Sequence, residues 1–180
     1  MKSTVRVLLL VMLTASLTSC EKIKSLFDIE VETTISGNLD IEVDETELKS
    51  TDGFGFNESI TVQVLNDDLY EYEDEIEDFV VSGVTAEVDF VSEDGVEFLE
   101  GTIFTISNTT YTVQWILDSD WPIEVGTSFN LVDAGLYDMV EDILDDRMPF
   151  TMSAVGESSI GGVTVVIRLG IETTVTVNPT

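Results

Sequence analysis

The sequence predicts a mainly β fold, an antiparallel β-sandwich of about eight strands with two short helices. Three observations carry this prediction. Apolar and polar residues alternate with period two through much of the chain, which is typical of strands with one buried face. Short connectors containing Gly, Asp and Asn separate these stretches, as they do between antiparallel neighbours. No long linker divides residues 27–180, so we expect a single acidic domain, with two packed sheets favoured over a closed barrel.

The first two predicted strands form a hairpin. Residues 27–35 alternate apolar and polar side chains, Gly37-Asn38 has the composition of a two-residue turn, and residues 39–43 resume the alternation. Residues 45–58 are polar and contain glycine, so we expect a loop there. Residues 60–64 alternate again and predict a third strand.

Residues 66–79 are predicted to form the first helix. Asn66 or the aspartates after it can cap the start of this helix. Its acidic face has no Lys or Arg at four-residue spacing, so packing of an apolar stripe must hold it. Four side chains at spacings of three and four residues form that stripe: Leu69, Tyr72, Ile76 and Phe79.

Three further strands are predicted over residues 80–91, 96–107 and 111–117. The connectors between them are short and polar, which predicts a three-stranded meander of sequential neighbours.

The second helix is predicted over residues 131–146, and the last two strands over 150–155 and 162–177. The last strand contains a sequence echo of the first. Val31-Glu-Thr-Thr-Ile35 and Ile171-Glu-Thr-Thr-Val175 share one pattern. Chance explains such an echo in a chain rich in Val, Thr and Glu. The alternative hypothesis is that the two strands have equivalent environments and pair.

The first 19 residues are typical of a signal peptide. A charged start precedes the apolar run at residues 7–13, which is too short to span a bilayer. The segment Leu17-Thr18-Ser19-Cys20 resembles the lipobox of bacterial lipoproteins. The resemblance implies cleavage before Cys20, a diacylglyceryl group on its thiol and a further acyl chain, such as palmitate, on the new amino terminus. Residues 20–26 would then be a tether. The alternative is an ordinary thiol after a secretory signal.

Composition excludes several classes of function. The 180 residues contain 7 Lys plus Arg, 36 Asp plus Glu, no His and one Cys, for a formal net charge of −29. Without histidine there is no Ser-His-Asp or Cys-His catalysis and no mixed-ligand zinc site. One cysteine forms no intramolecular disulfide. Because nucleic-acid binding depends on neutralising phosphates with Lys and Arg, we expect no nucleic-acid partner.

Carboxylates are the only abundant chemical groups, and no cofactor is predicted. Paired acids hydrolyse glycosides in a suitable cleft, but no pair in the sequence meets that geometric requirement, so we expect no enzyme. Calcium takes six to eight oxygen ligands. Residues 118–120 and 92–95 lack a complete calcium loop and are read as turns, which leaves weak calcium binding by dense carboxylates open.

The two tryptophans have different expected roles. Trp115 alternates with apolar residues and is predicted to lie in the core. Trp121 precedes Pro122 in a connector, so it is a weak candidate for binding a sugar ring or a partner. Packing over the edge of the sandwich is the favoured alternative, since aromatic residues bury a large area.

Together these observations predict an exported protein, lipid-anchored in a bacterial cell envelope of Gram-negative type, with the outer membrane favoured over the inner one. Its domain is expected to bind a protein or glycan partner, or to organise the envelope, without catalysis. The alternative function is a small carboxylate-dependent hydrolase acting on envelope or extracellular polysaccharide. A third hypothesis treats the acidic body as a solubility adaptation to saline surroundings.

Overall fold

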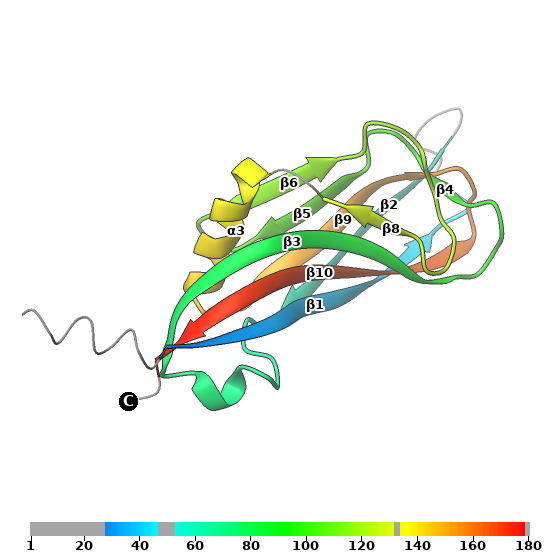
Figure 1. The fold of residues 1–180 in the computed structure, drawn as a ribbon. Coiled ribbons are helices and arrows are strands. Elements are labelled where there is room, and N and C mark those ends of the chain that lie inside the picture. The colour runs from blue at the N-terminus through cyan, green and yellow to red at the C-terminus, as the bar shows by residue number, and fades with distance from the viewer. Residues whose placement is uncertain (1–27, 47–52, 132–133, 179–180) are drawn as a thin grey trace, which may run out of the picture.

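Two antiparallel sheets pack face to face around one apolar core (Figure 1). The computed structural model describes residues 28–46, 53–131 and 134–178. Within these residues the chain is mainly β, and the sheets do not close into a barrel. The predicted β-sandwich is therefore confirmed. In place of two helices, the described residues contain one α-helix and one 3-10 turn.

Sheet A is built from the longest strands. Its order is β1 (Ile29–Val43), β10 (Val163–Val177), β3 (Ile76–Val91) and the short β8 (Ser128–Asn130). β1 and β10 pair without interruption from Ile29 opposite Val177 to Val43 opposite Val163. The hypothesis that the two echoing segments pair is confirmed, because both lie in this ladder.

Sheet B contains the shorter strands. β2 (Phe54–Val62), β9 (Phe150–Ser158), β5 (Ile103–Ser107) and β6 (Thr112–Ile116) are successive neighbours. At one end of the sheet, β4 (Glu97–Phe98) pairs with β9 and with β7 (Trp121–Pro122).

The predicted turn at Gly37-Asn38 is wrong, because β1 runs through it as one strand. Gly37 lies where β1 passes close to β2. A Cβ added at Gly37 would meet Val62 Cγ2 at 2.6 Å and Ile60 Cγ2 at 3.3 Å. The glycine therefore permits close approach of the two strands, which is the other common reason for glycine in a strand.

The predicted loop at residues 45–58 is wrong over its second part, since β2 already begins at Phe54. The predicted meander is also wrong. β3 belongs to sheet A, whereas β4, β5 and β6 belong to sheet B. The chain crosses between sheets after β3, and only the β5–β6 hairpin joins sequential neighbours as expected.

The predicted helix at residues 66–79 is wrong as well. Only a 3-10 turn, η1 (Tyr70–Tyr72), forms, and β3 starts at Ile76. Asn66 does cap the preceding turn, because its Oδ1 accepts the N–H groups of Asp68 and Leu69 at 3.1 Å. Leu69, Ile76 and Phe79 of the predicted stripe are buried and Tyr72 is partly buried. They pack from a turn and from β3, and the unpaired acids of this segment would not support a helix.

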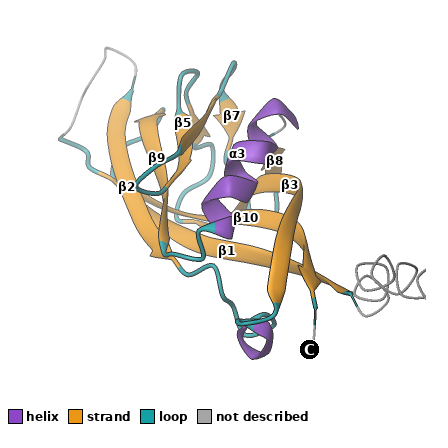
Figure 2. Cartoon of the chain, turned by 90° about the vertical axis from the view of Figure 1, so that its left-hand side faces the viewer, coloured by secondary structure: helices purple, strands orange, loops and turns teal. Residues whose placement is uncertain are grey.

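The helix α3 (Ala134–Asp145) confirms the second predicted helix, although Val132 lies outside the described residues. Figure 2 shows α3 on the open side of the sandwich, between sheet B and β3. Val140, Ile143 and Leu144 are fully buried there. Glu141 Oε1 accepts the backbone N–H of Val81 at 2.8 Å, which ties the helix to β3.

The two ends of the sandwich differ. At the entry end, β1 begins at Ile29 beside the last residue of β10, Val177, and η1 lies close by (Figure 1). At the loop end, β1 finishes, β2 and β10 begin, and the connectors at residues 92–96 and 159–162 lie nearby. A tether leading into β1 would therefore reach the domain at the entry end.

Candidate functional site

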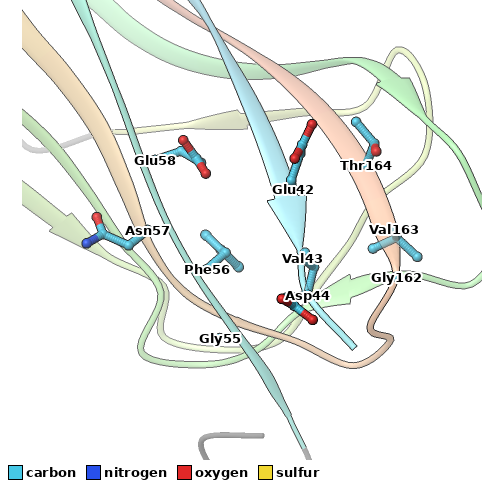
Figure 3. A pocket seen from close by; sticks show the side chains of 10 residues that line it. All are labelled: Glu42, Val43, Asp44, Gly55, Phe56, Asn57, Glu58, Gly162, Val163 and Thr164. Atoms are coloured by element: carbon cyan, nitrogen blue, oxygen red, sulfur yellow. The ribbon is translucent and has the colours of Figure 1, made fainter. Parts of the chain in front are cut away.

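A depression of about 810 Å³ opens at the loop end (Figure 3). It is formed by the end of β1, the first half of β2 and the start of β10. This volume lies within the range of small-molecule sites. The following residues line it: Glu42, Val43, Asp44, Gly55, Phe56, Asn57, Glu58, Gly162, Val163 and Thr164.

One wall is held by the last pair of the β1–β10 ladder. Val43 lies opposite Val163, and the N–H of Gly162 donates to the carbonyl oxygen of Val43 at 2.7 Å. Gly162 has a φ of 73°, which favours glycine, and a Cβ there would lie 2.5 Å from Glu45 Oε1. The turn into β10 therefore depends on this glycine.

The floor is apolar and supported from below. Phe56 is 2% exposed, and its ring centroid lies 4.6 Å from that of Phe98. Phe98 in turn packs edge-on against Trp121 at 6.1 Å, and Trp121 contacts Phe104 and Phe129. Such aromatic pairs add about 0.5–1.5 kcal/mol beyond their buried area. This aromatic cluster joins the floor of the depression to the core.

The rim is acidic. Glu42, Asp44 and Glu58 line the depression, and no Lys or Arg is among its lining residues. Asp44 Oδ1 accepts the backbone N–H and the hydroxyl of Thr46, each at 2.8 Å. These two hydrogen bonds, the backbone one first, lower the pKa of Asp44 and keep it ionised. The rim can attract cationic groups and accept hydrogen bonds from hydroxyl groups.

Trp121, the residue singled out in the connector, is 8% exposed and belongs to the aromatic cluster. It supports Phe56 through Phe98 and does not line the depression. A direct contact between Trp121 and a ligand stays a prediction. Trp115 is also 8% exposed and lies in the core, but its Nε1 has no hydrogen-bond partner among the described residues.

The two acidic turns considered for calcium have other roles in the structure. Asp120 Oδ1 accepts the backbone N–H of Glu100 at 2.8 Å. Ser92 Oγ accepts the N–H of Thr164 at 2.9 Å, which joins that turn to β10. Among the described residues, no group of three or more acids is arranged to hold a metal ion. Weak calcium binding at the surface stays a prediction.

The sequence did not single out the acidic rim. The alternation places Glu42 on the polar face of a predicted strand, Asp44 just after that strand, and Glu58 in a predicted loop. The alternation of Phe54 and Phe56 with Gly55 and Asn57 was the available signal for an earlier start of β2. Cys20, the expected lipid attachment site, lies outside the described residues.

No protein-family model matches the chain, and no curated protein matches its sequence significantly. In the part of the chain that the structure describes, no helix is long and apolar enough to cross a membrane.

Proposed function

We propose that this chain is a bacterial lipoprotein, held in the cell envelope by acyl chains on Cys20. Its β-sandwich would bind a partner there without catalysis. The outer membrane is the favoured site, and a lipid anchor needs no spanning helix, since two chains anchor a protein stably. One structural observation supports this proposal. The chain enters the sandwich at one end, and the acidic depression lies at the opposite end.

This separation suits an anchored binding domain. The sandwich would stand away from the membrane with its strands along the membrane normal, and the depression would face outward. Loops on a rigid scaffold are the usual place for recognition. The rim carries Glu42, Asp44 and Glu58 and no basic residue, so we propose a ligand with cationic or hydroxyl groups.

The anchor is tested by mass and fractionation. A Cys20→Ala chain expressed in a Gram-negative host should lose the acyl mass and leave the membrane fraction. If Cys20→Ala keeps the mass and membrane fractionation of the unmodified sequence, the lipoprotein proposal is wrong.

The binding site is tested with tetralysine and a neutral glucose oligomer, titrated separately by calorimetry. Glu42→Gln/Glu58→Gln should weaken binding of the recognised probe at least about tenfold, because both changes remove charge at the rim. Glu30→Gln/Glu32→Gln is the matched control, since it removes the same number of charges from the entry end of β1.

Equal losses in the two double variants would indicate general attraction to an acidic protein and would contradict a site at the loop end. If neither tetralysine nor the glucose oligomer binds, the proposed ligand chemistry is wrong. Release of reducing sugar from the glucose oligomer, lost in Glu42→Gln/Glu58→Gln, would favour the hydrolase alternative.

A further inference from the structure

The outer face of sheet B carries no charge over three complete rows of its four main strands. The core-facing residues of these strands, such as Phe104 and Met152, are buried, and the residues between them face outward. Strand pairing aligns twelve outward residues in rows: Asn57, Val155, Ile103 and Ile116; Ser59, Ser153, Thr105 and Gln114; Thr61, Thr151, Ser107 and Thr112. We call these twelve residues the neutral face.

Such a face is unexpected in this chain. Charged residues make up 24% of the sequence, and they concentrate at surfaces, so at least about three would be expected among twelve outward positions. The outer face of sheet A behaves as expected. Pairing of β1, β10 and β3 aligns twenty outward residues there, of which eight are charged: Glu30, Glu32, Asp40, Glu42, Asp78, Glu87, Arg168 and Glu172.

In one row of the neutral face, the three residues beside Asn57 are aliphatic. Ile116 is 62% exposed and Val155 is 39% exposed, with Ile103 between them in the register. The other two rows consist of hydroxyl and amide side chains. Gln114 Nε2 donates to Thr105 Oγ1 at 3.5 Å, so these two side chains bond to each other between neighbouring strands. A mostly apolar row beside short polar side chains is suited to contact with another flat surface.

We propose that the neutral face is the contact surface between two copies of this chain tethered side by side on one membrane. This inference rests on the proposed function for its membrane setting. The strands run from the entry end to the loop end, so the faces of both sheets point sideways from a molecule tethered at the entry end (Figure 1). A two-fold axis along the strands then joins two neutral faces and leaves both tethers on the same side.

Charge restricts contact between two copies to the neutral face. After removal of residues 1–19 the chain carries 5 basic and 36 acidic residues, a net charge of −31. Two such molecules repel each other through their acidic surfaces but not through this face. In the dimer the two outer faces of sheet A are separated by three sheet spacings, about 30 Å, whereas the Debye length is about 8 Å at physiological ionic strength. Repulsion between the two outer faces of sheet A is therefore screened in the dimer.

Area explains why the membrane is needed. Four strands about 4.8 Å apart and three rows about 7 Å apart give a face of roughly 400 Å² per copy. A dimer would bury about 800 Å² in total, below the 1,200–2,000 Å² of stable interfaces. The contact is consequently weak in solution, and tethering both copies raises their effective concentration.

Disulfide trapping tests the contact. We use the chain from residue 20 onward with Cys20→Ser and a C-terminal hexahistidine, bound to nickel-chelating lipid in neutral phosphatidylcholine vesicles. This tether leaves the domain at the entry end, because Val177 lies opposite Ile29. Ser153→Cys places one cysteine in the middle of the neutral face, and Ser36→Cys places one on the outer face of sheet A.

Under mild oxidation on vesicles, Ser153→Cys should give on the order of tenfold more disulfide-linked dimer than Ser36→Cys, and little dimer at the same concentration without vesicles. Adding Thr105→Glu should abolish the excess. Gln114→Cys on the exposed edge strand β6 provides a second reporter if Ser153→Cys lowers the melting temperature.

Equal trapping from Ser153→Cys and Ser36→Cys would show random collision and overturn the inference. Absence of dimer, together with binding of a neutral glucan that Thr105→Glu abolishes, would assign the face to a glycan and also overturn it. The nickel tether replaces the lipid, so this result is independent of acylation. Failure of the Cys20→Ala test contradicts the lipoprotein proposal alone.

Discussion

Thr33 on β1 lies directly opposite Thr173 on β10, at the centre of the two echoing segments. Antiparallel pairing sets Val31 opposite Val175 and Ile35 opposite Ile171, so the apolar residues of the echo meet across the ladder. The glutamates do not meet. Glu32 lies opposite Thr174, and Glu172 lies opposite Thr34. The shared pattern thus lets two acidic strands pair without placing like charges directly opposite each other.

The first prediction concerns this register. Thr34→Glu would place a second carboxylate opposite Glu172, so we expect a loss of about 0.5–1 kcal/mol in the free energy of unfolding. Urea denaturation at low and high sodium chloride measures it, and salt should reduce the loss. Ser36→Glu is the matched control, because the opposing residue is Gly170. An equal, salt-independent loss in both variants would contradict the role assigned to the register.

The second prediction concerns the close approach of β1 and β2. Gly37→Ala would put a Cβ 2.6 Å from Val62 Cγ2, so overpacking should lower the unfolding free energy by about 1–3 kcal/mol. In Gly37→Ala/Val62→Ala the clash is removed, and the combined loss should be smaller than the sum of the two single losses. Additive losses in urea denaturation would contradict a direct contact between the two positions.

The third prediction concerns pH. Asp145 lies in the last turn of α3, where burial and then the neighbouring Asp78 and Asp142 raise its pKa, against the lowering effect of Arg147. A carboxyl whose pKa is raised by folding binds more protons in the folded state. Its protonation therefore stabilises the fold below the unfolded pKa of about 3.9, and this contribution is lost as pH rises through the folded pKa.

Asp145→Asn should consequently stabilise the protein at pH 7 by about 0.5 kcal/mol, since it also removes an acid from a helix C-terminus. The gain should shrink as the pH is lowered toward 4. Melting temperatures of Asp145→Asn and of Asp138→Asn, earlier on the same helix, measure the effect across pH. A gain that grows on acidification would refute the assigned direction of the pKa shift.

The fourth prediction compares two arginines. Arg147 has a φ of 52° and donates to the carbonyl oxygens of Glu73 and Ile76, which joins the end of α3 to the start of β3 and to the segment before it. Arg147→Ala should therefore cost about 1.5–3 kcal/mol, as hydrogen bonds from a charged group are strong. Arg168 pairs with Glu87 at 2.8 Å on the exposed face of sheet A, so Arg168→Ala should cost less than about 1 kcal/mol. Guanidinium denaturation that ranks the two losses in reverse order would contradict this comparison.

The sequence predicted the sandwich because period-two alternation depends only on which face of a strand is buried. Gly37 shows where such local reasoning stops. A glycine beside an asparagine has the same local signature whether it forms a turn or lets two strands approach, and only the position of Val62 in space distinguishes the two. The stripe from Leu69 to Phe79 is similar, because burial of those residues is compatible with a helix or with a turn followed by a strand.

Assignment of strands to sheets was beyond the sequence for the same reason. β3 pairs with β10, some eighty positions further along the chain, and not with the strand that follows it. The acidic rim shares this origin. Glu58 lines the same depression as Glu42 and Asp44 because β2, in sheet B, lies beside the end of β1, in sheet A, and no spacing along the chain records that arrangement.

The uninterrupted ladder between β1 and β10 also determines how the domain would carry a mechanical load. A pull between the entry end of β1 and a partner at the loop end acts along the strands. Where the partner holds the start of β10, this pull shears the ladder from Ile29–Val177 to Val43–Val163 at once. A pull between the two chain ends would instead open the same ladder one pair at a time, starting at Ile29. The direction that a tethered molecule would experience is therefore the one in which its longest strand pair shares the force.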